Sequence, residues 1–387
     1  GDVYRARTVV SGFGALSRPA YPSVPGLERF AGKTFHSATW DLDYDLRGKR
    51  VAVIGTGASA IQFVPQIAPQ VAKLHVFQRT APWVMHKPDR AITAFERFLF
   101  KHVPFTQVLF RATIYFLLEL RVLGFKDANA MRIVQNLARR HIAKHIRDRG
   151  LRKKLTPTYT LGCKRILLSN DWYPALAREN VEVVSDAIAE VREHSVVCAD
   201  GSEREVDAII YGTGFKVQEG VPQQLVFGTG GRDLAEVWSE GLRAYKGTTV
   251  AGFPNYFQLA GPNTGLGHSS MVYMIESQIA YTLDALKRMR KEGWASVEVK
   301  PEAQEAYCDR VQVGSSGSAW LSGCQSWYLD KHGRNTAIWP GFTFAFRREV
   351  RRFDAHAYIT TGALRWTAAG KTKSPQSLEQ APASAAH

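Results

Sequence analysis

Cysteine is scarce in this sequence, and its spacing excludes most of what clustered cysteines build. The 387 residues include four cysteines, and they form no C-x-x-C pair and no cluster with histidine: Cys163, Cys198, Cys308 and Cys324. This spacing argues against a zinc site and against a disulfide framework. We therefore expect four unconnected thiols, no bound metal and a reducing, cytoplasmic compartment.

The sequence also lacks an apolar run long enough to cross a membrane. Its most apolar region, from Leu99 to Phe125, is broken by charged residues and by Pro104 well before about 20 apolar residues accumulate. We expect residues 114–118 to form a buried helix instead. A signal peptide is absent from the start of the sequence, and so is an initiator methionine, which favours a chain cut from a longer protein.

Acidic residues are outnumbered, with 35 Asp and Glu against 50 Lys and Arg. Much of the excess lies between Lys126 and Lys154, where apolar residues at spacings of three and four predict an amphipathic helix: Met131, Val134, Ala138, Ile142 and Ile146. We expect its basic face to be solvated and not to bind nucleic acid. Weak contact with an anionic membrane surface is the alternative.

On both sides of this helical block, short β-branched strands alternate with helices, which predicts an α/β fold. One strand, 51–54, leads through a glycine turn directly into a helix. The first glycine permits the tight turn, the second lets backbone approach a pyrophosphate, and the helix N-terminus supplies free N–H groups. The turn thus predicts a dinucleotide site formed by Gly55, Thr56, Gly57, Ala58 and Ser59.

The end of the next strand indicates which dinucleotide binds. An NAD site places Asp or Glu there to accept from the ribose 2′-OH, but this sequence has Arg79 and Thr80. A guanidinium can hold a 2′-phosphate with two hydrogen bonds, whereas a carboxylate would repel it. We therefore predict NADPH.

A second motif precedes the glycine turn. It reads F-x-G-x-x-x-H-x-x-x-W-D and comprises Phe30, Gly32, His36, Trp40 and Asp41. In this order and separation the two motifs resemble the type I Baeyer–Villiger monooxygenases, a branch of the flavin-containing monooxygenases. The resemblance implies two Rossmann-like dinucleotide-binding domains with a helical insertion, and FAD and NADPH as cofactors. It also implies that O2 reacts to a C4a-peroxyflavin, which inserts one oxygen beside a ketone carbonyl to give an ester or lactone.

Further residues take their roles from this resemblance. Lys164 assists at the 2′-phosphate, and Arg165 points at the flavin to stabilise the peroxyflavin and the substrate oxyanion. Such charges need a fixed cation in a dry site, in the cleft between the lobes. We interpret His36 as coupling the two nucleotide domains, with Trp40 and Asp41 completing the catalytic fingerprint.

Two later segments resemble the returning FAD domain of the family. A strand ends in Gly212-Thr-Gly214-Phe, like the family's hinge beside the cofactor, and Gly214 is the predicted contact. The segment Pro262, Asn263 and Thr264 resembles the family's turn beside the isoalloxazine ring. The aromatic residues from Trp327 to Trp339 are expected to line or buttress the cavity.

The expected domains follow the family's order. They are a remnant of the first FAD segment with the linker (1–47), the NADP domain (48–84 and 162–206), the helical insertion (85–161), the returning FAD segment (207–367) and a disordered tail (368–387). The family's first strand–GxGxxG–helix unit is not found before residue 47, so the FAD domain is expected to be incomplete.

Two alternatives remain open at this point. The same flavin chemistry could oxygenate a thioether or an amine in place of a ketone. The chain could also be a truncated, non-catalytic NADP(H)-binding remnant or a basic surface-binding module.

Overall fold

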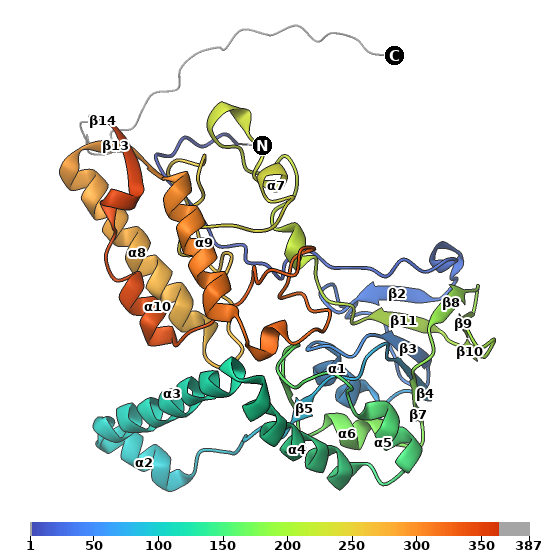
Figure 1. Cartoon of the computed structure of the whole chain (residues 1–387). Helices are drawn as coiled ribbons and strands as arrows, with labels where there is room; N and C mark the ends of the chain where they lie inside the picture. Colours follow the sequence, from blue (N-terminus) through green and yellow to red (C-terminus); the bar gives the residue numbers. More distant parts are fainter. Residues whose placement is uncertain (1, 364–387) are drawn as a thin grey trace, which may run out of the picture.

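The computed structural model of the chain describes residues 2–363 (Figure 1), so the expected disorder of 368–387 lies outside the described residues. Its centre is a five-stranded, entirely parallel sheet in the order β2-β11-β3-β4-β7. These strands are β2 (Lys33–His36), β3 (Arg50–Ile54), β4 (Lys73–Phe77), β7 (Val181–Val184) and β11 (Ala208–Tyr211). The α/β class expected from the sequence is confirmed.

The central strands β11 and β3 are apolar apart from Arg50 at the start of β3, because both faces of the sheet are covered. All four residues of β11 are buried, as are four of the five in β3. One cover is α1 (Ala60–Ile67), which packs beside α6 (Trp172–Leu176). The helix predicted after the glycine turn is therefore confirmed, and Pro65 lies inside it.

The sheet extends beyond the predicted NADP-domain boundaries. Strand β2 lies in the predicted linker and β11 in the predicted returning segment, yet both pair within the sheet that contains β3, β4 and β7. The two strands link the predicted domains through backbone hydrogen bonds. The division into domains itself stays a prediction.

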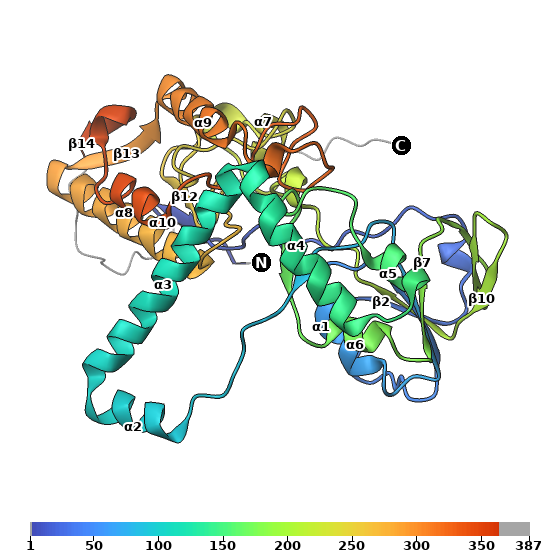
Figure 2. The same ribbon diagram turned by 60° about the horizontal axis from the view of Figure 1, so that its bottom comes forward.

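The helical block of the sequence forms four helices: α2 (Ala94–His102), α3 (Pro104–Lys126), α4 (Ala128–His145) and α5 (Arg149–Leu155). Helix α2 begins at a capping box in which Thr93 and Glu96 bond reciprocally. Figures 1 and 2 show α2 and α3 as a hairpin that extends away from the sheet, while α4 returns toward it.

One expectation for this block is wrong. Ile114, Phe116 and Leu117 lie in α3, but their side chains are 43%, 66% and 58% exposed and do not form a buried core. Apolar composition signalled burial, yet the hairpin projects from the body, so this part of the helix has little protein to pack against. Among the described residues, no helix is long and apolar enough to span a bilayer.

The segment between Lys126 and Lys154 has the burial that its amphipathic pattern predicts. It is divided into α4 and α5, and the predicted inner positions Met131, Ala138, Ile142 and Ile146 are all buried in the core that includes the sheet. The basic residues Arg132, Arg139 and Arg140 are exposed. The amphipathic interpretation is thus confirmed.

The remaining elements form smaller units around this centre. Strands β8 (Ile188–Val191), β9 (Ser195–Cys198) and β10 (Glu203–Glu205) make an antiparallel sheet. Three two-stranded sheets pair β1 (Val9–Ser11) with β12 (Tyr256–Gln258), β5 (Val84–Met85) with β6 (Leu167–Leu168), and β13 (Trp294–Val299) with β14 (Tyr358–Ala363). The other helices are α7 (Leu234–Val237), α8 (Met271–Glu292), α9 (Pro301–Ser315) and α10 (Thr343–Glu349), with short 3-10 turns at Leu27–Arg29, Val217–Glu219, Thr229–Gly231, Ala319–Leu321 and Ala355–Ala357.

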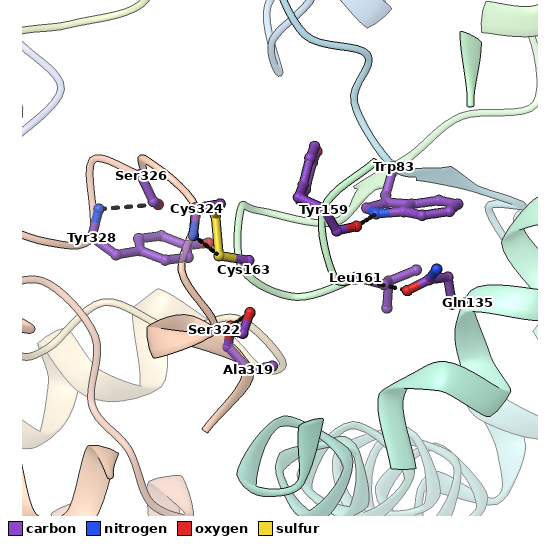
Figure 3. Close-up of a disulfide and its surroundings, with 10 residues drawn as sticks. All are labelled: Trp83, Gln135, Tyr159, Leu161, Cys163, Ala319, Ser322, Cys324, Ser326 and Tyr328. Atoms are coloured by element: carbon purple, nitrogen blue, oxygen red, sulfur yellow. Dashed lines mark hydrogen bonds between the residues drawn. A yellow bond between two sulfur atoms is a disulfide. The ribbon is translucent and has the colours of Figure 1, made fainter. Parts of the chain in front are cut away.

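A disulfide joins Cys163 to Cys324, so the expectation of four unconnected thiols is wrong (Figure 3). The two residues are 161 positions apart, a separation at which sequence spacing carries no pairing signal. Only Cys198 and Cys308 are free, and both are buried. Because disulfides persist mainly in oxidising compartments, the bond also removes the basis for the expected reducing compartment.

The disulfide connects two loops that are otherwise far apart in the chain. Cys163 lies between α5 and β6, and the Cys324 N–H approaches its sulfur at 3.2 Å. The first loop is also held by the Trp83 indole, which donates to the Tyr159 carbonyl at 2.9 Å, and by the Leu161 N–H, which donates to Gln135 at 3.2 Å (Figure 3). The disulfide is the covalent link from this loop to the C-terminal region.

We predict that reducing the disulfide lowers the midpoint of thermal unfolding. Because the disulfide closes so long a loop, it lowers the conformational entropy of the unfolded chain. In the chain-entropy model this stabilises the folded state by up to about 5 kcal/mol. Calorimetry with and without a thiol reductant should show the shift in the wild type and no shift in Cys324→Ser. The control Cys198→Ala should show the same shift as the wild type. An unfolding midpoint of the wild type that does not change with reductant would contradict the prediction.

Candidate active site

The turn after β3 has a geometry that only glycine permits at its first position. Gly55 has φ +108°, and a Cβ there would lie 2.4 Å from the Gly212 carbonyl oxygen. The Thr56 hydroxyl donates to the Thr80 carbonyl at 3.4 Å, which joins the turn to the end of β4. The turn is therefore held between two neighbouring strand ends.

The rest of the turn is open. A Cβ on Gly57 would meet no protein atom closer than 4.0 Å, so packing alone does not require glycine there. Ala58 packs against the core, and the Ser59 side chain makes no capping hydrogen bond to α1. The Ile61 N–H already donates to the Gly57 carbonyl at 3.1 Å, and within residues 2–363 the N–H groups of Ser59 and Ala60 are left for another acceptor.

Two cations meet beside this turn. Arg79 follows β4 and is exposed, while the half-buried Lys164 ammonium lies 5.1 Å from the centre of the Tyr159 ring. Burial lowers the pKa of Lys164, and the nearby charge of Arg79 lowers it further. Within residues 2–363 neither cation forms an ion pair with a carboxylate, so the pair favours an anion.

Arg165 lies on the same loop, next to the disulfide. Burial raises the pKa of the Tyr328 hydroxyl, and the charge of Arg165 opposes that rise, so the guanidinium lies within electrostatic range of this hydroxyl. Its own side chain is exposed. The dry enclosure expected around Arg165 is therefore not formed by residues 2–363.

His36 ends β2 and is fully buried. Its Nδ1 accepts from the Ala38 N–H at 3.1 Å, and its ring contacts those of Tyr21 at 5.5 Å and Phe215 at 5.7 Å, both edge-on. Phe215 belongs to the predicted hinge. The geometry thus suits a residue that links β2 to this hinge, and the coupling role stays a prediction.

Trp40 and Asp41 contact other parts of the fold. Trp40 packs edge-on between Phe35 at 5.1 Å and Phe63 of α1 at 5.2 Å. Asp41 forms an ion pair with Lys33 at 2.5 Å, and this partner lowers the pKa of Asp41. Among the described residues, no hydrogen bond, ion pair or ring contact joins either residue to Arg165, and their catalytic role stays a prediction.

The hinge after β11 is open on one side. Gly214 has φ +81°, and a Cβ there would find no atom within 4 Å. Its carbonyl accepts from the Ala20 N–H at 2.9 Å, and the Thr213 hydroxyl donates to the Ala20 carbonyl. The hinge is thereby fixed to the segment before β2.

The segment from Pro262 to Thr264 is buried and bound to the C-terminal loop. Asn263, with φ +57°, donates from Nδ2 to the Asn335 carbonyl at 2.8 Å, and its N–H donates to Thr336 at 2.9 Å. The Thr264 hydroxyl donates to the Gly261 carbonyl at 2.6 Å. These bonds define one conformation of the turn.

Sequence reasoning missed a buried polar contact beside this turn. The Glu119 carboxylate of α3 accepts from the Thr343 N–H at 2.8 Å and from its hydroxyl at 2.7 Å, and it lies 3.7 Å from His268. Burial lowers the pKa of His268, and Glu119 opposes that shift. The available signal was a lone carboxylate in an apolar helix, which needs a partner when it is buried.

The family model for flavin-binding monooxygenase-like proteins matches residues 1–221. A Baeyer–Villiger monooxygenase of Pseudomonas aeruginosa is 57% identical over 387 residues, covering 99% of this chain and 73% of the relative. One from Streptomyces coelicolor is 50% identical over 356 residues, covering 91% of this chain and 69% of the relative.

Solved structures agree with these relatives. A cyclohexanone monooxygenase from Rhodococcus sp. Phi1 bound to NADP+ superposes with a TM-score of 0.81 at 26% identity, covering 94% of this chain and 76% of that one. An oxidized steroid monooxygenase bound to NADP gives a TM-score of 0.77 at 28% identity, covering 92% and 75%. The structural match extends over both Rossmann-like parts, and the chain belongs to the Baeyer–Villiger monooxygenases, flavin- and NADPH-dependent enzymes of the flavin-binding monooxygenase family.

Proposed function

We propose that this chain binds NADPH on the turn 55–59, with Arg79 and Lys164 holding its 2′-phosphate, and that Arg165 assists oxidation of a ketone to an ester or lactone. The observation that carries the proposal is that Arg79 and Lys164 lie within electrostatic range of each other and that neither is paired with a carboxylate among the described residues. A site for NADH would need an acidic side chain there.

The open turn supports the same assignment. Gly57 meets no close protein atom, and the N–H groups of Ser59 and Ala60, at the positive end of the α1 dipole, make no hydrogen bond within residues 2–363. A pyrophosphate would satisfy these donors. Its approach would also account for a glycine that packing does not require.

We place the isoalloxazine end of FAD beside Gly214 and the segment from Pro262 to Thr264. The open space at Gly214 and the rigid, bonded turn at Asn263 support this placement. When bound, NADPH supplies a hydride, and FAD supplies the activation of O2.

The chain's own contribution is charge and position. Arg165 forms no ion pair among the described residues, so the charge of its guanidinium is available to the reaction. It would stabilise the negative charge that develops on the ketone oxygen. His36 and the hinge at Phe215 would hold the two nucleotide sites in a fixed position relative to each other.

Arg79→Ala should weaken NADPH binding by about 10-fold to 100-fold and leave NADH binding unchanged, because only NADPH carries the 2′-phosphate. Titration calorimetry with both nucleotides tests this. The control Arg147→Ala removes another exposed arginine, one whose side chain has no hydrogen bond or ion pair among the described residues, and should change neither affinity. An equal loss for both nucleotides would contradict the phosphate assignment.

Arg165→Ala should lower ketone oxygenation by about 100-fold to 1,000-fold, the effect of losing one charge-stabilising group. Its NADPH affinity should stay within about twofold of the wild type, because Lys164 and Arg79 remain. Product analysis with a cyclic ketone and with a thioether checks the reaction, and Arg165→Lys should retain part of the activity.

The outcomes of this experiment distinguish the enzyme from its alternatives. Unchanged lactone formation in Arg165→Ala would refute the role of Arg165. Sulfoxide as the main wild-type product would favour heteroatom oxygenation. Wild-type protein that binds NADPH but shows no flavin absorbance after incubation with FAD would be a nucleotide-binding remnant.

His36 should make stability depend on pH below its ordinary pKa of about 6.5. Burial lowers its pKa in the folded chain, so the unfolded chain binds the proton more readily and stability falls as pH drops below that value. His36→Asn keeps an acceptor for the Ala38 N–H and should reduce this loss of stability at low pH. The difference from the wild type should be at most tenfold in the folding equilibrium constant per pH unit.

Denaturant unfolding between about pH 7 and pH 5 measures this difference. The exposed His194 offers a control, because His194→Asn should leave the pH dependence unchanged. A His36→Asn variant as acid-sensitive as the wild type would show that His36 does not stay neutral in the folded chain.

A further inference from the structure

The hairpin of α2 and α3 exposes an unusual concentration of apolar side chains. Between residues 95 and 123, twelve large apolar side chains are exposed: Phe95, Phe98, Val103, Phe105, Val108, Leu109, Phe110, Ile114, Phe116, Leu117, Leu120 and Leu123. Exposed patches of this kind mark surfaces that meet a partner or a membrane. The hairpin extends away from the body of the molecule, so all its outer faces are accessible (Figure 2).

Five of these side chains form a continuous stripe along α3, called the α3 stripe below. At 100° per residue they fall within a sector of about 60° on the helix, and they are 52–70% exposed: Phe105, Leu109, Phe116, Leu120 and Leu123. The inner face of the helix is a different one, with Glu119, Val122 and Phe125 buried. Core packing therefore leaves the α3 stripe without a partner among the described residues.

The charges of the hairpin are of one sign. Arg97, Lys101, Arg111 and Arg121 are exposed and form no ion pair within the described part of the chain. Its two carboxylates do not offset them, because Glu96 is paired with Arg90 and Glu119 is buried against Thr343. The hairpin that carries the apolar surface thus has a net positive charge that no carboxylate neutralises within the described part of the chain.

We propose that this hairpin docks on an anionic lipid bilayer, with the α3 stripe at the boundary between headgroups and acyl chains. Exposed apolar side chains on a hairpin with unneutralised Lys and Arg are the combination that binds such an interface. The hairpin lies on the membrane and does not cross it, since no described helix can span one. This binding is separate from the proposed NADPH and ketone chemistry.

A second copy of the chain fits this surface less well. A symmetric dimer would place the same patch on both partners, which brings two cationic hairpins together without a neutralising group. Anionic headgroups supply the missing charge. The charge pattern therefore selects lipid over self-association.

Sedimentation with vesicles tests the proposal. The wild-type chain should bind vesicles that contain phosphatidylglycerol more tightly than pure phosphatidylcholine vesicles, and rising salt should weaken the binding. Arg97→Gln/Lys101→Gln/Arg111→Gln should lose about fivefold per cation on the anionic vesicles. Phe105→Gln/Leu109→Gln/Phe116→Gln should lose at least about tenfold on both.

A matched control removes three exposed apolar side chains elsewhere, as Leu225→Gln/Phe227→Gln/Val313→Gln, and should bind vesicles like the wild type. NADPH affinity should be unchanged in all three variants, which separates lipid docking from the nucleotide site. Absent binding to anionic vesicles at low salt would overturn the proposal. So would a wild-type dimer that the α3-stripe variant converts to monomer.

Discussion

The close approach of two backbones at the ends of β3 and β11 is the constraint on which the rest of the site depends. A side chain on Gly55 would occupy the space of the Gly212 carbonyl, and the Gly212 N–H itself donates to Ile54 at 2.9 Å. Because β3 and β11 are adjacent and parallel, the nucleotide turn and the hinge form one unit. The direction in which α1 leaves that turn is thereby set, and with it the position of the free N–H groups.

The same edge of the sheet collects the other site elements. Parallel strands place their carboxyl ends together, so β2, β11 and β3 deliver His36, the hinge and the glycine turn side by side. The Ser37 N–H donates to the Tyr211 carbonyl at 3.0 Å, which continues the pairing beyond β2. A motif that looks like a linker in the sequence is therefore an integral strand of the nucleotide-binding sheet.

Features formed by residues close together in the sequence could be predicted from it, and contacts between distant residues could not. The turn at Gly55 and the hinge at Gly214 are local, since an apolar strand and a glycine spacing define each of them. The contact of Glu119 with Thr343 spans 224 residues, and no periodicity reports such a pair. Exposure of Phe116 was equally hidden, because an apolar helix has the same composition whether protein, lipid or water surrounds it.

The contacts between distant parts of the chain all involve one C-terminal segment, and this determines how Arg165 can act. The disulfide, the Glu119–Thr343 contact and the Asn263 bonds all reach the segment 319–343, which joins the helical insertion, the loop of Arg165 and the buried turn. Arg165 is thus positioned through its covalently tethered loop and the adjacent Tyr328 ring, with no carboxylate paired to it among the described residues. A guanidinium held by an ion pair would have its charge already neutralised. One positioned by the surrounding framework keeps that charge for the oxygen that becomes anionic during the reaction.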